Sequence, residues 1–169
     1  YGADFLNAND WSATPIAADF LGISTTGDAT AETITGATGN DILSGLGGKD
    51  IINGFDGWDK LDGGDGNDRL LGGAKDDLLT GGEGNDKLIG QSGKDTAVFG
   101  DGDNSIDLAI KIRQDTGEGL DLLKTIENVK GGDGDDTIKG DNKGNYLYGE
   151  VGNDKLFGRR GNDRLFGDL

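Results

Sequence analysis

Aliphatic side chains recur in this chain with a period of nine residues. In each nine-residue unit the aliphatic residue stands at the eighth place, and the seventh to ninth places alternate polar, apolar and polar. This alternation predicts a short strand with one inward side chain. The members of this column are Leu43, Ile52, Leu61, Leu70, Leu79, Leu88, Ala97, Ile138, Leu147, Leu156 and Leu165.

Glycine opens each unit, and aspartate usually stands at its sixth place. The first six places follow the pattern Gly-Gly-x-Gly-x-Asp, which is rich in residues that tolerate positive φ. Such a segment predicts a sharp turn that directs several carbonyl groups into one small space. The opening glycines are Gly36, Gly45, Gly54, Gly63, Gly72, Gly81, Gly90, Gly131, Gly140, Gly149 and Gly158, and Gly167 begins one more unit.

Alternating short strands and turns predict an all-β solenoid. Two units make one full coil, so every second unit stacks directly on its equivalent, about 4.8 Å away. We therefore expect a right-handed parallel β-roll, with the sixth-place aspartates aligned along its two walls.

The repeats divide the chain into four segments. Residues 27–98 form a first block, which begins with a degenerate unit, and residues 131–169 form a second, truncated block. Residues 99–130 are expected to form a non-repeat connector that packs on the roll, with a longer half-buried strand over 106–112. Because the length of this connector is not a multiple of nine, the second block is not expected to continue the first in register. Residues 1–26 are interpreted as an N-terminal cap or the remnant of a linker.

Composition excludes several classes of function. Among 169 residues there is no Cys and no His, which removes disulfides, Cys/His zinc sites and catalysis by imidazole or thiolate. The net charge of −16 opposes binding to nucleic acid. No apolar run approaches the roughly 20 residues of a membrane span. No enzyme is expected within this chain.

The stacked aspartates indicate a bound cation. Bare carboxylates at this spacing repel each other by roughly 1 kcal/mol per pair in water, and by more when desolvated. A divalent cation between them reverses the sign of the interaction. Ca²⁺ accepts six or more oxygen ligands at about 2.3–2.6 Å, whereas Mg²⁺ demands a tight octahedron, so several Ca²⁺ ions are expected.

At these residues the sequence resembles the RTX (repeats-in-toxin) family, whose nonapeptide is G-G-x-G-x-D-x-U-x. The resemblance covers residues 36–98 and 131–166, and the units that begin at Gly63 and Gly81 match the turn motif in full. It implies a calcium-stabilised β-roll in a protein that a type I secretion apparatus exports unfolded and that folds outside the cell.

The resemblance also implies a set of calcium ligands. The aspartates are Asp41, Asp50, Asp59, Asp68, Asp77, Asp86, Asp95, Asp136, Asp154 and Asp163. The turn glycines, which would contribute main-chain oxygens, are Gly36, Gly45, Gly54, Gly63, Gly64, Gly66, Gly72, Gly81, Gly82, Gly84, Gly131, Gly132, Gly134, Gly149 and Gly158. Several units depart from the motif: Leu46, Phe55 and Gln91 replace the second glycine, Lys75 replaces the fourth, and Asn145 replaces the aspartate.

These observations favour a non-catalytic, secreted, extracellular module that folds when it binds calcium. One alternative is an accessory module that binds an acidic polysaccharide such as alginate, as in secreted mannuronan epimerases. Arg69 and Lys87 stand two units apart at the seventh place and would contact such a polyanion, although a solvated face is the simpler interpretation. Another alternative is a segment of an adhesin or a surface-layer protein.

Overall fold

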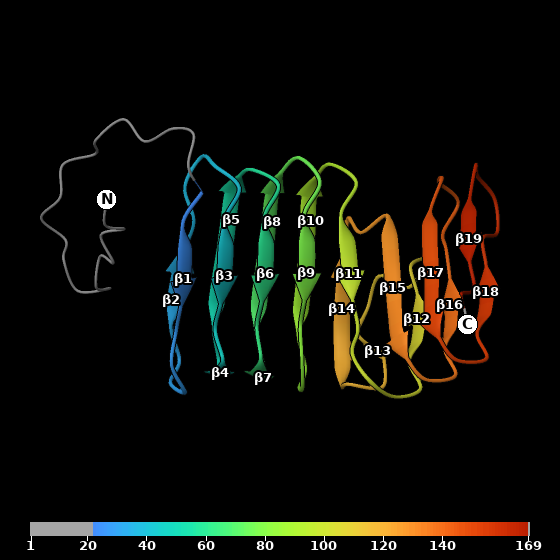
Figure 1. Cartoon of the computed structure of the whole chain (residues 1–169), viewed down its shortest axis with the longest axis horizontal. Helices are drawn as coiled ribbons and strands as arrows, with labels where there is room; N and C mark the ends of the chain where they lie inside the picture. Colours follow the sequence, from blue (N-terminus) through green and yellow to red (C-terminus); the bar gives the residue numbers. More distant parts are fainter. Residues whose placement is uncertain (1–21, 169) are drawn as a thin grey trace, which may run out of the picture.

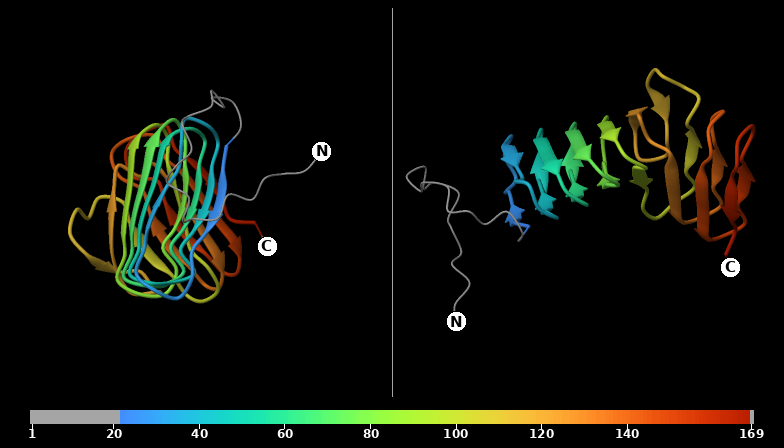
Figure 2. Two further views of the ribbon diagram at one scale, coloured as in Figure 1. Left: turned by 90° about the vertical axis from the view of Figure 1, so that its left-hand side faces the viewer. Right: turned by 90° about the horizontal axis from the view of Figure 1, so that it is seen from above.

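The computed structural model describes residues 22–168, and all regular secondary structure within these residues is β-strand. The coils are stacked along one long axis, and in the view down that axis they nearly superimpose (Figures 1 and 2). The prediction of an all-β parallel β-roll is therefore confirmed. The part of the predicted N-terminal cap that covers residues 1–21 lies outside the described residues.

One wall of the roll is an eight-stranded parallel sheet that runs through both blocks. Neighbouring strands in the first block come from units two apart in the sequence, as Ile42 and Lys60 do. In spatial order the strands are β1 (Ser24–Thr26), β3 (Ile42–Ser44), β6 (Lys60–Asp62), β9 (Leu78–Thr80), β11 (Thr96–Val98), β15 (Asn128–Asp133), β17 (Tyr146–Val151) and β19 (Arg164–Phe166). Because β1 pairs with β3, Ser24–Thr26 belongs to the roll although it lies inside the segment 1–26.

The second wall is divided between two sheets. The first contains β2 (Thr33–Thr35), β5 (Ile51–Asp56), β8 (Arg69–Ala74), β10 (Lys87–Ser92), β14 (Leu120–Lys124) and β13 (Gln114–Asp115). The other contains β12 (Ser105–Asp107), β16 (Thr137–Lys139) and β18 (Lys155–Phe157). The short strands β4 (Gly47–Gly48) and β7 (Asp65–Gly66) pair at the turns.

The connector supplies strands to both walls. Along the chain β12 comes first, but it pairs with β16 of the second block, whereas the later β14 pairs with β10 of the first block. The chain then enters β15, which pairs directly with β11, so Thr96 faces Asn128. The expected loss of register is therefore wrong for the eight-stranded sheet, because the doubling back of the connector restores the alignment.

The strand predicted over 106–112 ends early. Only Ser105–Asp107 is extended, and Ile110 and Ile112 are exposed. The Asp107 carboxylate accepts the N–H of Ala109, and its carbonyl accepts the N–H of Ile110. This local turn ends the strand despite the alternating pattern.

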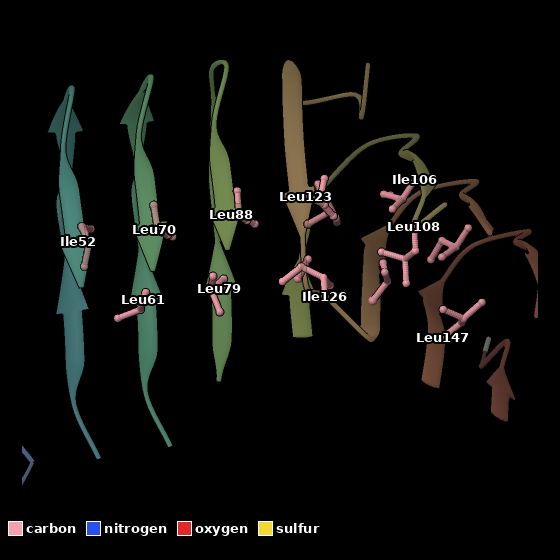
Figure 3. Packing of buried hydrophobic residues seen from close by; sticks show 14 of the residues in the cluster. Ile52, Leu61, Leu70, Leu79, Leu88, Ile106, Leu108, Leu123, Ile126 and Leu147 are labelled. Atoms are coloured by element: carbon pink, nitrogen blue, oxygen red, sulfur yellow. The ribbon is translucent and has the colours of Figure 1, made fainter. Parts of the chain in front are cut away.

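Inward aliphatic side chains form one core along the axis (Figure 3). The eighth-place residues from Leu43 to Leu88 are at most 1% exposed. The column continues through Ile106, Val129, Ile138 and Leu147, while Leu165 in the last strand is exposed. With one such side chain per nine-residue unit, this core is thin. Hydrophobic burial has to be supplemented by interactions at the turns.

Candidate metal-binding turns

The sixth-place residues of the first block form a ladder on each wall. In the first block, Oδ1 of each aspartate accepts the backbone N–H of the equivalent residue one coil earlier, at 2.6–3.0 Å. Asp59, for example, accepts the N–H of Asp41, and Asp77 accepts that of Asp59. The side chains are buried, because each aspartate stands two residues before the inward aliphatic side chain and points to the same side of the chain. One carboxylate oxygen of each aspartate is thus committed to holding successive coils together.

The second carboxylate oxygen has no hydrogen-bond partner at eight of these positions. All eight atoms are shielded from solvent, and each belongs to an aspartate predicted as a calcium ligand. They are the Oδ2 atoms of Asp50, Asp59, Asp68, Asp77, Asp86, Asp95, Asp136 and Asp154. A buried polar atom without a partner costs about 1–3 kcal/mol, and more when it carries charge. The ladder is therefore incomplete without a positively charged partner.

Each unpartnered oxygen faces the opening glycine of its own unit. A Cβ atom added to Gly54 would lie 2.3 Å from Oδ2 of Asp59 and 2.5 Å from the carbonyl oxygen of Gly72. The same arrangement surrounds Gly45, with Asp50 and the Gly63 carbonyl at 2.3 and 2.6 Å. Absence of a side chain here keeps open a small space bounded by carboxylate and carbonyl oxygens. This donor set suits a hard cation such as Ca²⁺.

Glycines at the second and fourth places allow successive turns to approach closely. Gly66 has φ of 143°, and a Cβ atom there would lie 1.6 Å from the carbonyl oxygen of Gly48. Gly64, Gly82, Gly84, Gly132 and Gly134 also have positive φ and lie against a carbonyl of the preceding coil. The remaining predicted glycines face the sixth-place carboxylate of their own unit, as Gly54 does: Gly36, Gly63, Gly72, Gly81, Gly131, Gly149 and Gly158.

Units that lack a motif glycine keep the turn geometry. Leu46, Phe55 and Gln91 occupy the second place with φ between 70° and 75°, and Lys75 occupies the fourth place with φ of 80°. Their units still contain the unpartnered oxygens of Asp50, Asp59, Asp77 and Asp95. The stacking of neighbouring turns imposes this backbone on residues that disfavour it.

Burial makes these carboxyl groups hard to ionise. Desolvation raises the pKa of Asp77 and of Asp86 to about 7 and that of Asp95 to about 6. The backbone N–H that each accepts lowers the pKa, and neighbouring carboxylates raise it again. Without a cation, burial therefore favours the neutral form of these carboxyl groups over a wider pH range than in a free aspartate.

Main-chain oxygens must complete any coordination sphere at these turns. Between residues 22 and 168, no three acidic side chains gather in a way that could hold a metal ion. The two coils that meet at each space present one free carboxylate oxygen and main-chain carbonyls. The same residues contain no helix that could cross a membrane.

Comparison with known families decides the identity of the repeats. The model of the RTX calcium-binding nonapeptide repeat matches four stretches, residues 26–57, 35–70, 71–106 and 130–165. This chain belongs to the RTX calcium-binding family. It is a calcium-binding module that takes up several Ca²⁺ ions. No curated protein gave a match to the chain.

The RTX pattern extends one unit beyond residue 98. Residues 99–107 keep the nine-residue phase, with Gly100 and Gly102 in the turn and buried Ile106 at the eighth place. Phe99 replaces the opening glycine and Asn104 replaces the aspartate, so the two most regular positions of the motif are lost here. The signal that could have revealed this unit is Gly-x-Gly followed by Ile at the eighth place.

The ladder contains further members that the motif did not reveal. Asp86 donates its N–H to Asp121 at 2.7 Å, and Asp95 donates its N–H to Glu127 at 3.3 Å. Glu32 donates its own N–H to Asp50 at 2.8 Å, so it begins the ladder on its wall. The available signal was Gly117-x-Gly119-x-Asp121 for the aspartate. The two glutamates had no such signal, because the motif specifies aspartate.

Asparagines also occupy ladder positions. Asn104 donates its N–H to Asp136 at 2.8 Å, and Asn145 donates its N–H to Asp163 at 3.0 Å. Both side chains are buried like those of the aspartates. An amide cannot offer a charged oxygen to a cation, so these two positions keep the geometry of the ladder but not its charge.

Two predicted aspartates differ from the other eight. Oδ2 of Asp41 accepts the N–H of Ala37 at 2.7 Å, so it already has a partner. Asp163 lies in the last described coil, where it is only half-buried and accepts the N–H of Asn145. These two positions therefore offer a cation a less available carboxylate oxygen than the other eight do.

Proposed function

We propose that this RTX chain is a non-catalytic folding module of a secreted protein, whose regular turns become ordered when Ca²⁺ binds to them. The eight buried carboxylate oxygens without partners support this proposal most directly. The occurrence of RTX repeats in secreted bacterial proteins supports the extracellular location and export through a type I apparatus.

Each ion would take its ligands from two successive coils. Oδ2 of a sixth-place aspartate and the carbonyl oxygen of the opening glycine one coil later would hold each ion, as Asp59 and Gly72 illustrate. The bound Ca²⁺ supplies the positive charge that neutralises the carboxylates and joins the coils. The aspartate Oδ1 and the strand hydrogen bonds hold these oxygens in place.

The same chemistry makes folding conditional on the compartment. In the absence of Ca²⁺, desolvated carboxylates and a net charge of −16 oppose the stacking of coils. At extracellular, roughly millimolar calcium, binding to the folded state alone shifts the equilibrium toward the roll. The chain would therefore stay open during export and fold outside.

A calcium titration of the purified chain, followed by far-ultraviolet circular dichroism, tests this function. We expect a cooperative change from coil to β signal with Ca²⁺ and no such change with equimolar Mg²⁺. The matched variants are Asp68→Ala and Asp65→Ala, since Asp65 is an exposed residue of the same turn. The first should raise the calcium midpoint tenfold or more, and the second less than twofold. A chain fully folded in metal-free buffer, or unordered at several millimolar Ca²⁺, contradicts the proposal.

Binding of an acidic polysaccharide is a second candidate function. It is favoured by a cavity of about 950 Å³ whose lining includes Lys94, Lys143, Arg164 and the ring of Tyr146. The Arg164 guanidinium lies 5.1 Å from the centre of that ring, and Lys143 pairs with Glu127 at 3.0 Å. Cations beside an aromatic ring suit a carboxylated sugar.

The cations singled out from the sequence lie on another surface. Arg69 and Lys87 are register partners on β8 and β10. Charge reversal separates the two surfaces: Lys94→Glu with Arg164→Glu should abolish salt-sensitive binding of an oligouronate, whereas Arg69→Glu with Lys87→Glu should not. Loss with only the second pair would move the site to β8 and β10, and no binding by the calcium-loaded wild type would reject this function.

A further inference from the structure

In the middle of the roll, the sixth-place side chains of most turns have hydrogen-bond or ion-pair partners within the protein. We call residues 99–147 the junction; it contains the sixth-place residues Asn104, Asp121, Glu127 and Asn145. We call the turns of Asp50, Asp59, Asp68, Asp77, Asp86 and Asp95 the regular turns, and in each of them the second carboxylate oxygen lacks a partner. At each of the four junction positions, by contrast, a side-chain donor takes part in the turn. Asp136, which the junction shares with the second block, is the exception.

Asn104 stands in the place of the aspartate, and its amide group donates hydrogen bonds to oxygens that would otherwise face a cation. Its side-chain NH₂ group donates to the carbonyl oxygens of Gly100, Gly102 and Gly131 at 3.1, 2.9 and 3.0 Å. The Gly131 carbonyl stands to Asn104 as the Gly72 carbonyl stands to Asp59, since each opens the next stacked unit. Asn104 is 3% exposed, so the amide lies among the oxygens that would otherwise face a metal.

The other three positions use different donors for the same purpose. The hydroxyl of Thr116 donates to Oδ2 of Asp121, which is buried. Lys143 pairs with Glu127 at 3.0 Å. The amide of Asn145 donates to the carbonyl oxygen of Glu127 at 2.8 Å, and its Oδ1 accepts the N–H of Asp141 at 2.9 Å. At these turns, hydrogens of a hydroxyl, an ammonium and an amide group interact with the oxygens that a cation would otherwise contact.

The junction also carries more apolar side chains than a regular unit. Besides the eighth-place Ile106, Leu123 and Val129, it buries Phe99, Leu108 and Ile126. Figure 3 shows Leu108, Leu123 and Ile126 beside Ile106 between the walls. Here the core compensates for a weaker metal contribution, because burial of a large apolar side chain stabilises the fold in proportion to the area removed from water.

We infer that the turns of Asn104, Asp121, Glu127 and Asn145 bind no calcium, and that the junction stays ordered at calcium concentrations too low for the regular turns. The inference rests on the proposed function, which assigns calcium to those regular turns. Hydrogen bonds within the protein do not depend on the concentration of an ion, whereas metal bridges do. The junction thus provides a calcium-insensitive base on which both stacks order.

Hydrogen exchange of the full chain at stepped Ca²⁺ concentrations tests this difference. Amides of the turns at Asp59, Asp68 and Asp77 should gain protection with a midpoint at least tenfold higher in calcium than the amides of Asn104 and Thr116. Coincident midpoints overturn the inference while leaving the proposed function intact. If the regular turns show no response to calcium, the proposed function itself fails.

Counting bound ions by native mass spectrometry gives a second, independent readout. Asn104→Asp should bind one more Ca²⁺ than the wild type, and its junction amides should become calcium dependent. Asn104→Ala should keep the wild-type number of ions. The control is Asn67→Asp, an exposed position in a regular turn, which should not change the count. Loss of an ion from Asn104→Ala, or no gain in Asn104→Asp at saturating Ca²⁺, overturns the inference.

Discussion

The regular turns between Gly45 and Val98 and the junction share one backbone ladder but complete it by different chemistry. In the first region each aspartate bonds the preceding coil through Oδ1 and leaves Oδ2 buried and unpartnered. In the junction, Asn104, Asp121 and Asn145 continue the ladder with side chains whose polar atoms are paired. The stacking geometry therefore does not itself require a metal. Whether a coil leaves a carboxylate oxygen without a partner depends on the sixth-place residue and on the side-chain donors beside it.

This contrast is the physical basis of the inferred partial response to calcium. A buried carboxylate is unfavourable until a cation reaches it, so every regular unit lowers the stability of the metal-free roll. An amide or a hydroxyl makes its hydrogen bond as soon as the coil closes. The regular turns are thus suited to sensing calcium, and the junction is suited to holding the two blocks together.

The largest difference between the regular turns and the junction is expected when Asp86 and its ladder neighbour Asp121 are each replaced by alanine. Asp86→Ala removes an unpartnered oxygen, so it should raise the calcium midpoint tenfold or more, about 1.4 kcal/mol or above. Asp121→Ala removes the partner of Thr116 and should lower the free energy of unfolding by about 1–3 kcal/mol at any calcium concentration. Calcium titrations and urea unfolding at saturating Ca²⁺ check the pair. Equal calcium dependence of both variants would contradict the comparison.

Acid should stabilise the regular turns when no metal is present. The pKa values of Asp77 and Asp86 are raised to about 7 in the fold, against 3.8 for an unperturbed aspartate, so the folded state binds more protons. Their contribution is fully present below the unperturbed pKa of 3.8 and is lost as the pH rises through about 7. Circular dichroism in metal-depleted buffer should show more β signal at pH 5 than at pH 8. The opposite order would mean that these groups are not desolvated. With calcium present, acid should weaken binding instead.

Glycine at a second place should relieve backbone strain without touching a ligand. Leu46 is exposed and has φ of 70°, a conformation that costs a side-chain residue about 1 kcal/mol. Leu46→Gly should raise the free energy of unfolding, measured in urea at saturating Ca²⁺, by about 1 kcal/mol. Leu46→Ala should leave it unchanged. If both variants behave alike, stacking energy rather than strain dominates this turn.

The smallest effect is expected from an ion pair between the junction and the second block. Arg159 donates to both oxygens of Asp107 at 2.6 Å. Burial raises the pKa of Asp107, but the hydrogen bonds from Arg159 and from the N–H of Ala109, together with the charges of Arg159 and Lys139, lower the pKa overall. Arg159→Ala should lower the free energy of unfolding by about 0.2–1 kcal/mol, less at high salt. Arg160→Ala, at an exposed neighbour, is the control and should be neutral.

Most of the roll was predictable because its information is local and repeated. The column from Leu43 to Leu88 and the stacking of every second unit followed from a period visible in the sequence. The eight aspartates with unpartnered oxygens had all been named, since one motif recurs at each of them. The connector was predicted less well. Its strand ended at Asp107, and its ladder residues Asp121 and Glu127 went unnoticed.

By itself, the sequence determined the repeat, the all-β roll and the positions of its stacked aspartates, because a short period allows each unit to stack only on its equivalents. Only the tertiary structure decided that β14 stacks on β10 while the earlier β12 stacks on β16, and that Asn104 reaches three carbonyls. These contacts join residues from different coils at irregular separations. Their energies depend on which groups meet in space, and local spacing does not encode that.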